Sequence, residues 1–332
     1  MGSPLPVGPQ EIVAPDPRLA QRQDPAREHD KTNHRRKLFV AAGASLGELQ
    51  GFIRGNWIPE EIARMEEIAT FWRQANSSYR NLQTSETNLF SQTTLEPPEP
   101  GLTSLLQEIT AQPLFQSSYG EHRVRIMKVS TRNLVSCQRH VDLDYVRNLV
   151  AHLRSNAEPE AVARFCLLPP LPLETPKQLQ IGPNAFCFSS PNTDFRFLGG
   201  YARPFTDRDV QSCWMGGQPA AMVVLMLGYG TPSMNAFKVG DRTILSNGFH
   251  RAYSLLSLGI EHAYVVVREI TDLSTEFPPI LGVVPSDQLL NHPRPVLTRD
   301  FFNKSLALEL RGSPGLRNIQ VAWNASQVNV PL

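Results

Sequence analysis

The spacing of apolar residues divides the first hundred residues into two regions. Residues 1–36 contain six prolines and almost no clustered aliphatic side chains, and such a composition cannot offset the entropy of ordering. From 38 to about 82, apolar residues recur at intervals of three and four, which predicts helix. The predicted apolar face comprises Ile62, Met65, Ala69 and Trp72. We therefore expect a disordered tail over 1–36 and a helical region ending in a proline-rich linker over 37–100.

Strand and helix patterns alternate in the next part of the chain. Val124 to Val129 alternates as a strand does, and Asp142 is a plausible N-cap for a helix that ends near Leu153. The segment 155–212 holds many prolines between short apolar pieces, which indicates an irregular or β-rich insertion.

The most informative pattern lies between 218 and 268. A long apolar run, 218–229, is followed by a hydrophilic hairpin connection, by the turn 248–251, by an amphipathic stretch and by the strand-like 263–268. This order predicts strand, tight turn, helix, strand. Beyond it the chain is rich in proline, with a short helix predicted near 300–310 and an edge strand near 319–323. We expect an α+β protein with its main domain over 101–270, interrupted by the insertion at 155–212, and an extension over 271–332.

Composition limits the classes of function. The chain has 332 residues, 41% of them hydrophobic, and a formal net charge of +1, so bulk charge gives no support to polyanion binding. Four dispersed cysteines form no Cys-x-x-Cys pair, which fits a reducing compartment. The N-terminal segment has no signal-peptide core, and the longest apolar stretch is too short to span a bilayer. We expect a cytoplasmic protein without membrane association.

The turn Gly248-Phe249-His250-Arg251 is the candidate for chemistry. Gly248 allows a close backbone approach, and a helix that begins at this point offers free amide groups beside a guanidinium. These residues suit a phosphate, although a helix start that only caps and forms salt bridges within the fold is the alternative. The basic run 33–37 and His140 are further groups that could contact phosphate, but a solvated approach to the first element explains that run more simply.

These residues resemble the ParB/sulfiredoxin superfamily, a small α/β nucleotide-binding fold. The resemblance covers 124–154 and 214–268, and it rests on Gln218-Pro219 at the start of a hydrophobic strand and on the Gly-x-His-Arg turn. It implies that Gly248, His250 and Arg251 hold the phosphates of ATP, ADP or CTP with magnesium. It also implies that Asn247 supplements them with its side-chain amide, that Arg139 faces the phosphate and that Gln218 belongs to the ligand site.

At three places the sequence departs from the family's residue pattern, and each departure argues against one of the family's activities. Phe249 stands where sulfiredoxins carry the catalytic cysteine, which argues against sulfinic acid reduction. No helix-turn-helix pattern follows Arg268, so we expect no sequence-specific DNA binding. No glutamate lies in 130–140 to act as the base of a free-serine kinase.

Three functions stay open at this point. The first is binding of a nucleotide or another phosphorylated small molecule, with or without hydrolysis or phosphoryl transfer by a hydrolase or kinase-like enzyme. The second is a non-enzymatic scaffold that binds a protein partner or a second copy of the chain. The third is a nuclease, which needs clustered carboxylates for a metal. We assign no metal site, because the triplet 207–209 is more typical of a surface helix start.

Overall fold

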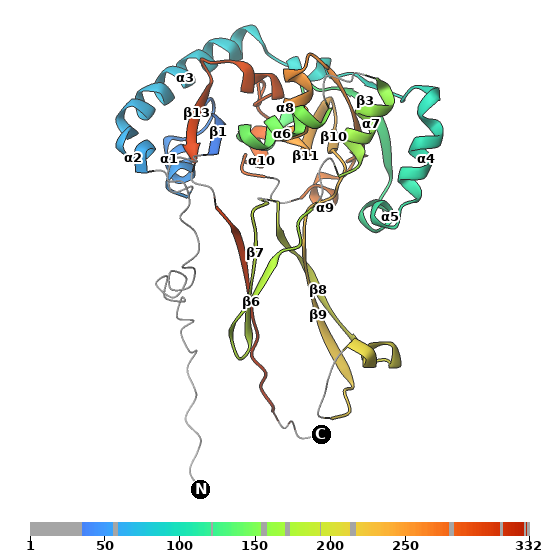
Figure 1. Ribbon diagram of the computed structural model, residues 1–332. Coiled ribbons are helices and arrows are strands. Elements are labelled where there is room, and N and C mark those ends of the chain that lie inside the picture. The colour runs from blue at the N-terminus through green and yellow to red at the C-terminus, as the bar shows by residue number, and fades with distance from the viewer. Residues whose placement is uncertain are drawn as a thin grey trace. The chain divides into compact units, whose positions relative to one another are not determined.

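The computed structural model describes residues 35–55, 59–120, 122–153, 158–169, 173–192, 194–212, 217–278, 282–312, 315–328 and 330. They belong to one compact unit, His34–Leu332, which contains both helices and several small sheets (Figure 1). The α+β class predicted from the sequence is therefore confirmed. Residues 1–34 of the predicted tail, and Trp57 of the helical region, lie outside the described residues. The prediction of a tail is wrong for Arg35 and Arg36, which belong to the strand Arg35–Val40.

A six-stranded mixed sheet forms the centre, in the order β2-β3-β12-β10-β11-β4. Its strands are β2 Leu95–Glu96, β3 Val124–Ser130, β4 Val135–Ser136, β10 Asn235–Val239, β11 Arg242–Asn247 and β12 His262–Glu269. β12 pairs antiparallel with β3 and parallel with β10, while β10 and β11 form an antiparallel hairpin. The five consecutive residues from Ala263 to Val267 are all buried, as expected for a strand covered on both faces.

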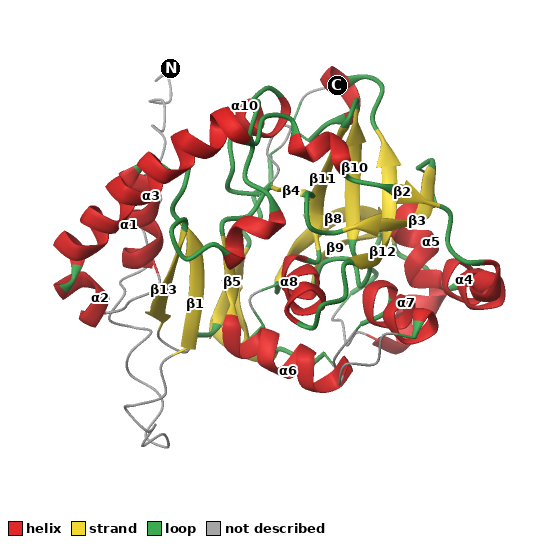
Figure 2. Ribbon diagram, turned by 90° about the horizontal axis from the view of Figure 1, so that it is seen from above, coloured by secondary structure: helices red, strands yellow, loops and turns green. Residues whose placement is uncertain are grey.

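Some helices lie beside this sheet and others lie beside a smaller one (Figure 2). They are α1 Leu46–Gly55, α2 Pro59–Ala63, α3 Met65–Ser85, α4 Thr103–Ala111, α5 Pro113–Tyr119, α6 Leu143–Leu153, α7 Pro159–Leu167, α8 Phe249–Ser257, α9 Leu273–Glu276 and α10 Ser286–Leu290. α6 packs against α8, and both α7 and α8 contact β12. Val146, Leu149 and Leu153 form the buried face of α6, which follows from their helical spacing. Among the described residues no helix is both long and apolar enough to cross a bilayer.

A second sheet, in the order β13-β1-β5, corrects two predictions. β1 Arg35–Val40 is a strand paired on both sides, with β5 His140–Asp142 and with β13 Ala307–Gly312. The helix predicted from residue 38 is therefore wrong as far as Ser45, since α1 begins at Leu46, and the helix predicted near 300–310 is wrong beyond Phe302, where a short 3-10 helix, Thr298–Phe302, ends. Pairing partners distant in sequence decided both cases, and spacing cannot reveal such partners.

A small hydrophobic cluster fills the space between this sheet and α1 and α3. Its buried members include Phe39, Leu49, Ile53, Ile68 and Leu310. The apolar face predicted for the helical region is wrong at Ile62, which is 48% exposed, and it omitted Ile68, which is buried. The helix is interrupted at Arg64, between α2 and α3, so the helical spacing does not continue across that residue.

Two further sheets come from 173–228 and from the C-terminal segment. One has the order β14-β7-β6, with β6 Lys177–Gly182, β7 Ala185–Ser190 and β14 Arg317–Ala322. The other consists of β8 Arg196–Pro204 and β9 Ala221–Gly228, which pair antiparallel with each other (Figure 1). The β-rich insertion and the edge strand near 319 are confirmed, although 159–167 is helical.

The position of β9 corrects the prediction for the long apolar run. The run forms a strand as predicted, but that strand belongs to the two-stranded sheet and not to the central sheet. Residues 229–234 connect two different sheets, so they do not close the hairpin that was predicted there. The hairpin that leads into Gly248 is β10–β11.

Candidate functional site

The turn at Gly248 joins β11 to α8 and depends on glycine. Gly248 has φ +101° and ψ 22° and stands at the N-cap of α8, a backbone conformation that residues with a side chain rarely adopt. A Cβ atom there would lie 2.4 Å from Cγ of Met234. Within the described residues, the amides of Phe249, His250 and Arg251 donate no hydrogen bond, as is usual for the first turn of a helix. The turn therefore has the backbone form that an anion site at a helix start requires.

Arg251 is buried and makes its contacts with backbone atoms. The residue is 6% exposed, and its Nη1 donates to the carbonyl oxygens of Cys166 at 2.8 Å and Pro232 at 2.6 Å. Longer bonds reach Phe165 and Leu168 at 3.3 and 3.4 Å. Burial lowers the pKa of Arg251. Its guanidinium ties the end of α7 and the 229–234 connection to α8.

Asn247 and Arg139 are also engaged within the fold. The Asn247 amide donates to the carbonyl oxygens of Thr231 at 2.8 Å and Ser233 at 3.1 Å. Arg139 is 1% exposed and donates to the carbonyl oxygens of Ala42 and Gly43, each at 2.8 Å. Both side chains hold loops in place.

His250 connects the N-termini of two helices. Its Nε2 accepts a hydrogen bond from the backbone amide of Asp142 at 2.9 Å, so Nε2 carries no proton. The Asp142 carboxylate accepts from the amides of Asp144 and Tyr145, each at 3.0 Å, and thereby caps α6 as predicted. The starts of α6 and α8 consequently meet at one point.

Basic side chains from β1 and β5 surround this meeting point. The pairing of Lys37 with Asp142 and of Phe39 with His140 sets Arg35, Lys37, His140 and Asp142 on one face of the strands. Arg35 Nη1 lies 3.8 Å from Asp142 Oδ2. The Phe52 ring lies 4.7 Å from the ring of His140 and 5.6 Å from Nζ of Lys37. We call Arg35, Lys37, His140 and His250 the basic cluster; all four are half-buried.

Burial holds the two histidines neutral. It lowers the pKa of His140 to about 3, with smaller contributions from His250 and Lys37. It lowers the pKa of His250 to about 4, against the opposing effects of Asp142 and Asp194. With neutral histidines, Arg35 and Lys37 carry the positive charge of the cluster, and Asp142 and Asp194 are the carboxylates that act on His250.

The structure brings together only part of the sequence-predicted site. Gly248 and His250 lie at the meeting point, and Asn247 and Arg251 hold the adjoining backbone. Gln218 is an exposed residue that precedes β9, outside the central sheet. The sequence did mark the run 33–37 and His140 as groups able to contact phosphate, but it did not place them beside His250.

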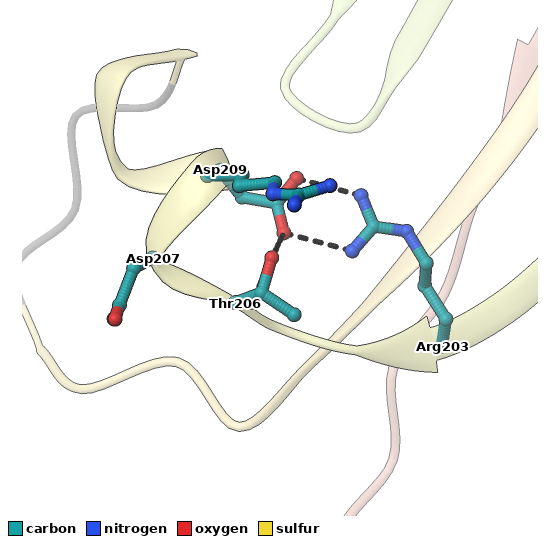
Figure 3. Close-up of a pocket in the computed structure, with 5 residues that line it drawn as sticks. Arg203, Thr206, Asp207 and Asp209 are labelled. Carbon is teal, nitrogen blue, oxygen red and sulfur yellow. Dashed lines mark hydrogen bonds and ion pairs between the residues drawn. The ribbon is translucent and has the colours of Figure 1, made fainter.

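The charged triplet at 207–209 lies in a hollow of about 480 Å³ in the segment between β8 and β9 (Figure 3). There Asp209 accepts two hydrogen bonds from the Arg203 guanidinium, at 2.6 and 2.7 Å, and one from Thr206 Oγ1 at 2.8 Å. Arg203 lowers the pKa of the Asp209 carboxyl. The carboxylate oxygens are used within the loop, which agrees with the structural interpretation of the triplet.

No three His, Cys, Asp or Glu side chains converge on a point suited to a metal ion in the part of the chain that the structure describes. The chain matches no protein-family model, and neither curated proteins nor solved structures give a significant match.

Proposed function

We propose that the protein binds a phosphate-bearing ligand, with a nucleotide as the first candidate, at the point where α6 and α8 begin. The observation that carries this proposal is the hydrogen bond from the Asp142 amide to His250, because it joins two helix starts within the basic cluster. Helix N-termini and cationic side chains both stabilise phosphate. The proposal keeps the location predicted from the sequence and changes the residues that act there.

Arg35, Lys37, His140 and His250 are the groups proposed to face the ligand, together with the first amides of α8. Gly248 permits the turn. Arg251, Asn247 and Arg139 are positioning residues in this proposal, since their donors already bind backbone carbonyls. The resemblance of 124–154 and 214–268 to the ParB/sulfiredoxin superfamily supports a nucleotide over other phosphates, and hydrolysis or phosphoryl transfer remains part of that expectation.

The two histidines are neutral in the free protein and are the groups of the site whose protonation a bound anion would favour. An added negative charge favours the charged form of a nearby imidazole and raises its pKa. The pKa values in the free protein are about 3 for His140 and about 4 for His250, so proton uptake on ligand binding, and the gain in affinity that accompanies it, should appear as the pH falls toward these values.

The test is a thermal shift assay with ATP, ADP, CTP, GTP and inorganic phosphate, each with and without magnesium. We expect at least one nucleotide to raise the melting temperature of the native protein, and the double variant Arg35→Gln, Lys37→Gln to lose most of that shift. Arg125→Gln is the matched control, because Arg125 is an exposed arginine on β3 that pairs there with Glu269. Absence of a shift with every compound, or an equal shift in the double variant, would refute the proposal.

Protein interaction is the second candidate function, and a specific observation favours it. Large apolar side chains of β8 and β9 are exposed, and exposed apolar surface is typical of binding faces. The nuclease alternative has no comparable observation in its favour among the described residues.

A further inference from the structure

Tyr145 is a large aromatic side chain beside the basic cluster that is not part of a core. It lies in the first turn of α6, which runs beside α8 (Figure 2). Its ring contacts the ring of His250 edge to face, with 5.2 Å between the ring centroids and 82° between the ring planes. The residue is 36% exposed, and it belongs to neither hydrophobic cluster in the described part of the chain. The ring therefore contacts His250 and leaves part of its surface open to solvent beside the proposed phosphate site.

The phenol group of Tyr145 is not needed to hold α6 in place. The backbone amide of Tyr145 donates to the Asp142 carboxylate at 3.0 Å, whereas no hydrogen bond from a described residue reaches its phenolic oxygen. Burial raises the pKa of Tyr145, so the side chain is uncharged at neutral pH. What it presents to solvent is consequently a flat, uncharged ring.

Phe52, the other aromatic ring beside the cluster, has a different role. Phe52 packs against the buried residues between α1, α3 and the smaller sheet, and its ring lies 4.7 Å from that of His140. Phe52 thus contributes to a core. Tyr145 has no such packing to explain its aromatic character.

The two sides of the proposed site differ in charge. The cationic side chains of the cluster come from β1. On the side of Tyr145, the carboxylate that acts on its pKa is Asp194, which is already paired with Arg196. The cation that acts there is Arg251, whose guanidinium is buried and donates to backbone carbonyls. An anionic group is therefore favoured beside β1, and an uncharged group beside Tyr145.

We propose that the base of a bound nucleotide stacks on the exposed ring of Tyr145, while its phosphates lie against the basic cluster and the start of α8. This inference rests on the proposed function and names the ligand class as a nucleotide, in preference to inorganic phosphate or polyphosphate. The contact with His250 fixes the orientation of the ring. Stacking on an aromatic side chain tightens binding of a base roughly tenfold or more, and every base has a face that can stack.

Isothermal titration calorimetry with ATP and with inorganic tripolyphosphate, each with magnesium, tests the proposal. Tripolyphosphate carries the phosphate chain of ATP but neither its ribose nor its base. If charge and backbone amides alone recognised the ligand, tripolyphosphate would bind at least as tightly as ATP. We expect ATP to bind the native chain roughly tenfold more tightly than tripolyphosphate.

Variants of Tyr145 separate the base from the phosphates. Tyr145→Ala should weaken ATP binding roughly tenfold and leave tripolyphosphate binding unchanged. Tyr145→Phe should bind both compounds as the native chain does, because the ring remains. Tyr201→Ala is the matched control, since Tyr201 is a 47% exposed tyrosine on β8. Circular dichroism, together with retained tripolyphosphate binding, establishes that each variant is folded.

Proton NMR of the ligand gives a readout of the stacking itself. The H2 and H8 protons of adenine should shift upfield when ATP binds the native chain, because they enter the ring current of Tyr145. That shift should be kept in Tyr145→Phe and lost in Tyr145→Ala.

The results distinguish failure of the stacking from failure of the phosphate site. Tripolyphosphate binding as tight as that of ATP, equal losses of both ligands in Tyr145→Ala, or native ATP affinity in Tyr145→Ala would each overturn the position of the base and leave the phosphate site in place. If neither compound binds the native chain, the phosphate site itself is refuted, and the position of the base with it.

Discussion

The basic cluster and the β8–β9 hairpin differ in how far their side chains are satisfied within one copy of the chain. Around the cluster, buried groups already have partners: Arg251 donates to backbone carbonyls and His250 accepts from an amide. On the hairpin, Val223 and Phe197 face solvent with no cover in the described structure. The first region is therefore fixed by internal contacts, whereas the second has surface that another molecule can bury.

This difference predicts where substitutions act. Changes near the cluster should reduce the free energy of unfolding, because they remove contacts present in each copy. Changes on the hairpin should leave that free energy nearly unaltered and should act on association. Substitutions and pH titration test this contrast, beginning with the largest expected effect.

Replacement of Arg251 should cause the largest loss of stability. Arg251→Ala removes a guanidinium that several buried carbonyls accept from, and unsatisfied buried groups cost about 1–3 kcal/mol each in the absence of rearrangement. We expect the free energy of unfolding in urea to fall by about 3 kcal/mol or more. Arg125→Ala is the control, because Arg125 is 71% exposed at its side chain and should change stability by less than about 0.5 kcal/mol. A loss below about 1 kcal/mol for Arg251→Ala would contradict the structural role of this residue.

Gly248 should be less tolerant of a side chain than a glycine with similar φ and open surroundings. Gly248→Ala combines φ +101° with a Cβ placed 2.4 Å from Met234 Cγ, and we expect a loss of about 2–3 kcal/mol. Gly259 has φ +76°, and no atom lies within 4 Å of the position that an added Cβ would occupy, so Gly259→Ala should cost about 1 kcal/mol. Equal losses in thermal melts of the two variants would show that the contact with Met234 is relieved at no cost.

The free energy of unfolding should decrease as the pH falls, because the buried histidines resist protonation. Their pKa values in the folded state, about 3 for His140 and about 4 for His250, lie below the value of about 6.5 expected in the unfolded chain. The unfolded chain therefore binds more protons below pH 6.5, and stability decreases from about pH 6.5 toward pH 4.

Allowing for their partial exposure, we expect the pair to account for about 2 kcal/mol between pH 7 and pH 5. Asp142, Asp194, Lys37 and Arg251 are the charged groups that influence these histidines. His250→Gln keeps an acceptor for the Asp142 amide, and its urea unfolding curves should show a weaker dependence on pH. An unchanged dependence would exclude His250 as a source of the effect.

The same substitution in the central sheet and in the hairpin should give the smallest but most direct contrast. Val265→Thr places a hydroxyl at a fully buried position of β12 and should cost about 1–2 kcal/mol of unfolding free energy. Val223→Thr, at a position 73% exposed, should stay within about 0.5 kcal/mol. If Val223→Thr destabilised the protein as much as Val265→Thr does, the Val223 side chain would have to be buried within a single copy of the chain.

Several elements could be predicted from the sequence because their signals are local. Alternation predicted the strand 124–129 and the strand 263–268, and capping predicted the helix that follows Asp142. Glycine at a strand-to-helix junction predicted the turn at Gly248. The exposed apolar run was also recognised as a strand. Each of these assignments depends on residues within a few positions of one another.

The assignments that failed depend on partners far along the chain. Lys37 pairs with Asp142 and Val40 with Ala307, so the start of the segment predicted as helix forms a strand. The apolar run was expected beside the turn at Gly248, and only the pairing of β9 with β8 showed that it forms a separate hairpin. Local spacing contains no information on which sheet a strand joins.

For the candidate site, the sequence by itself determined that a glycine turn with His250 and Arg251 begins a helix. Tertiary structure decided what those side chains do: it buried Arg251 among carbonyls and brought Arg35, Lys37 and His140 beside His250. The physical reason is that a helix start is specified by neighbouring residues, whereas burial and charge environment are set by the segments that fold over it.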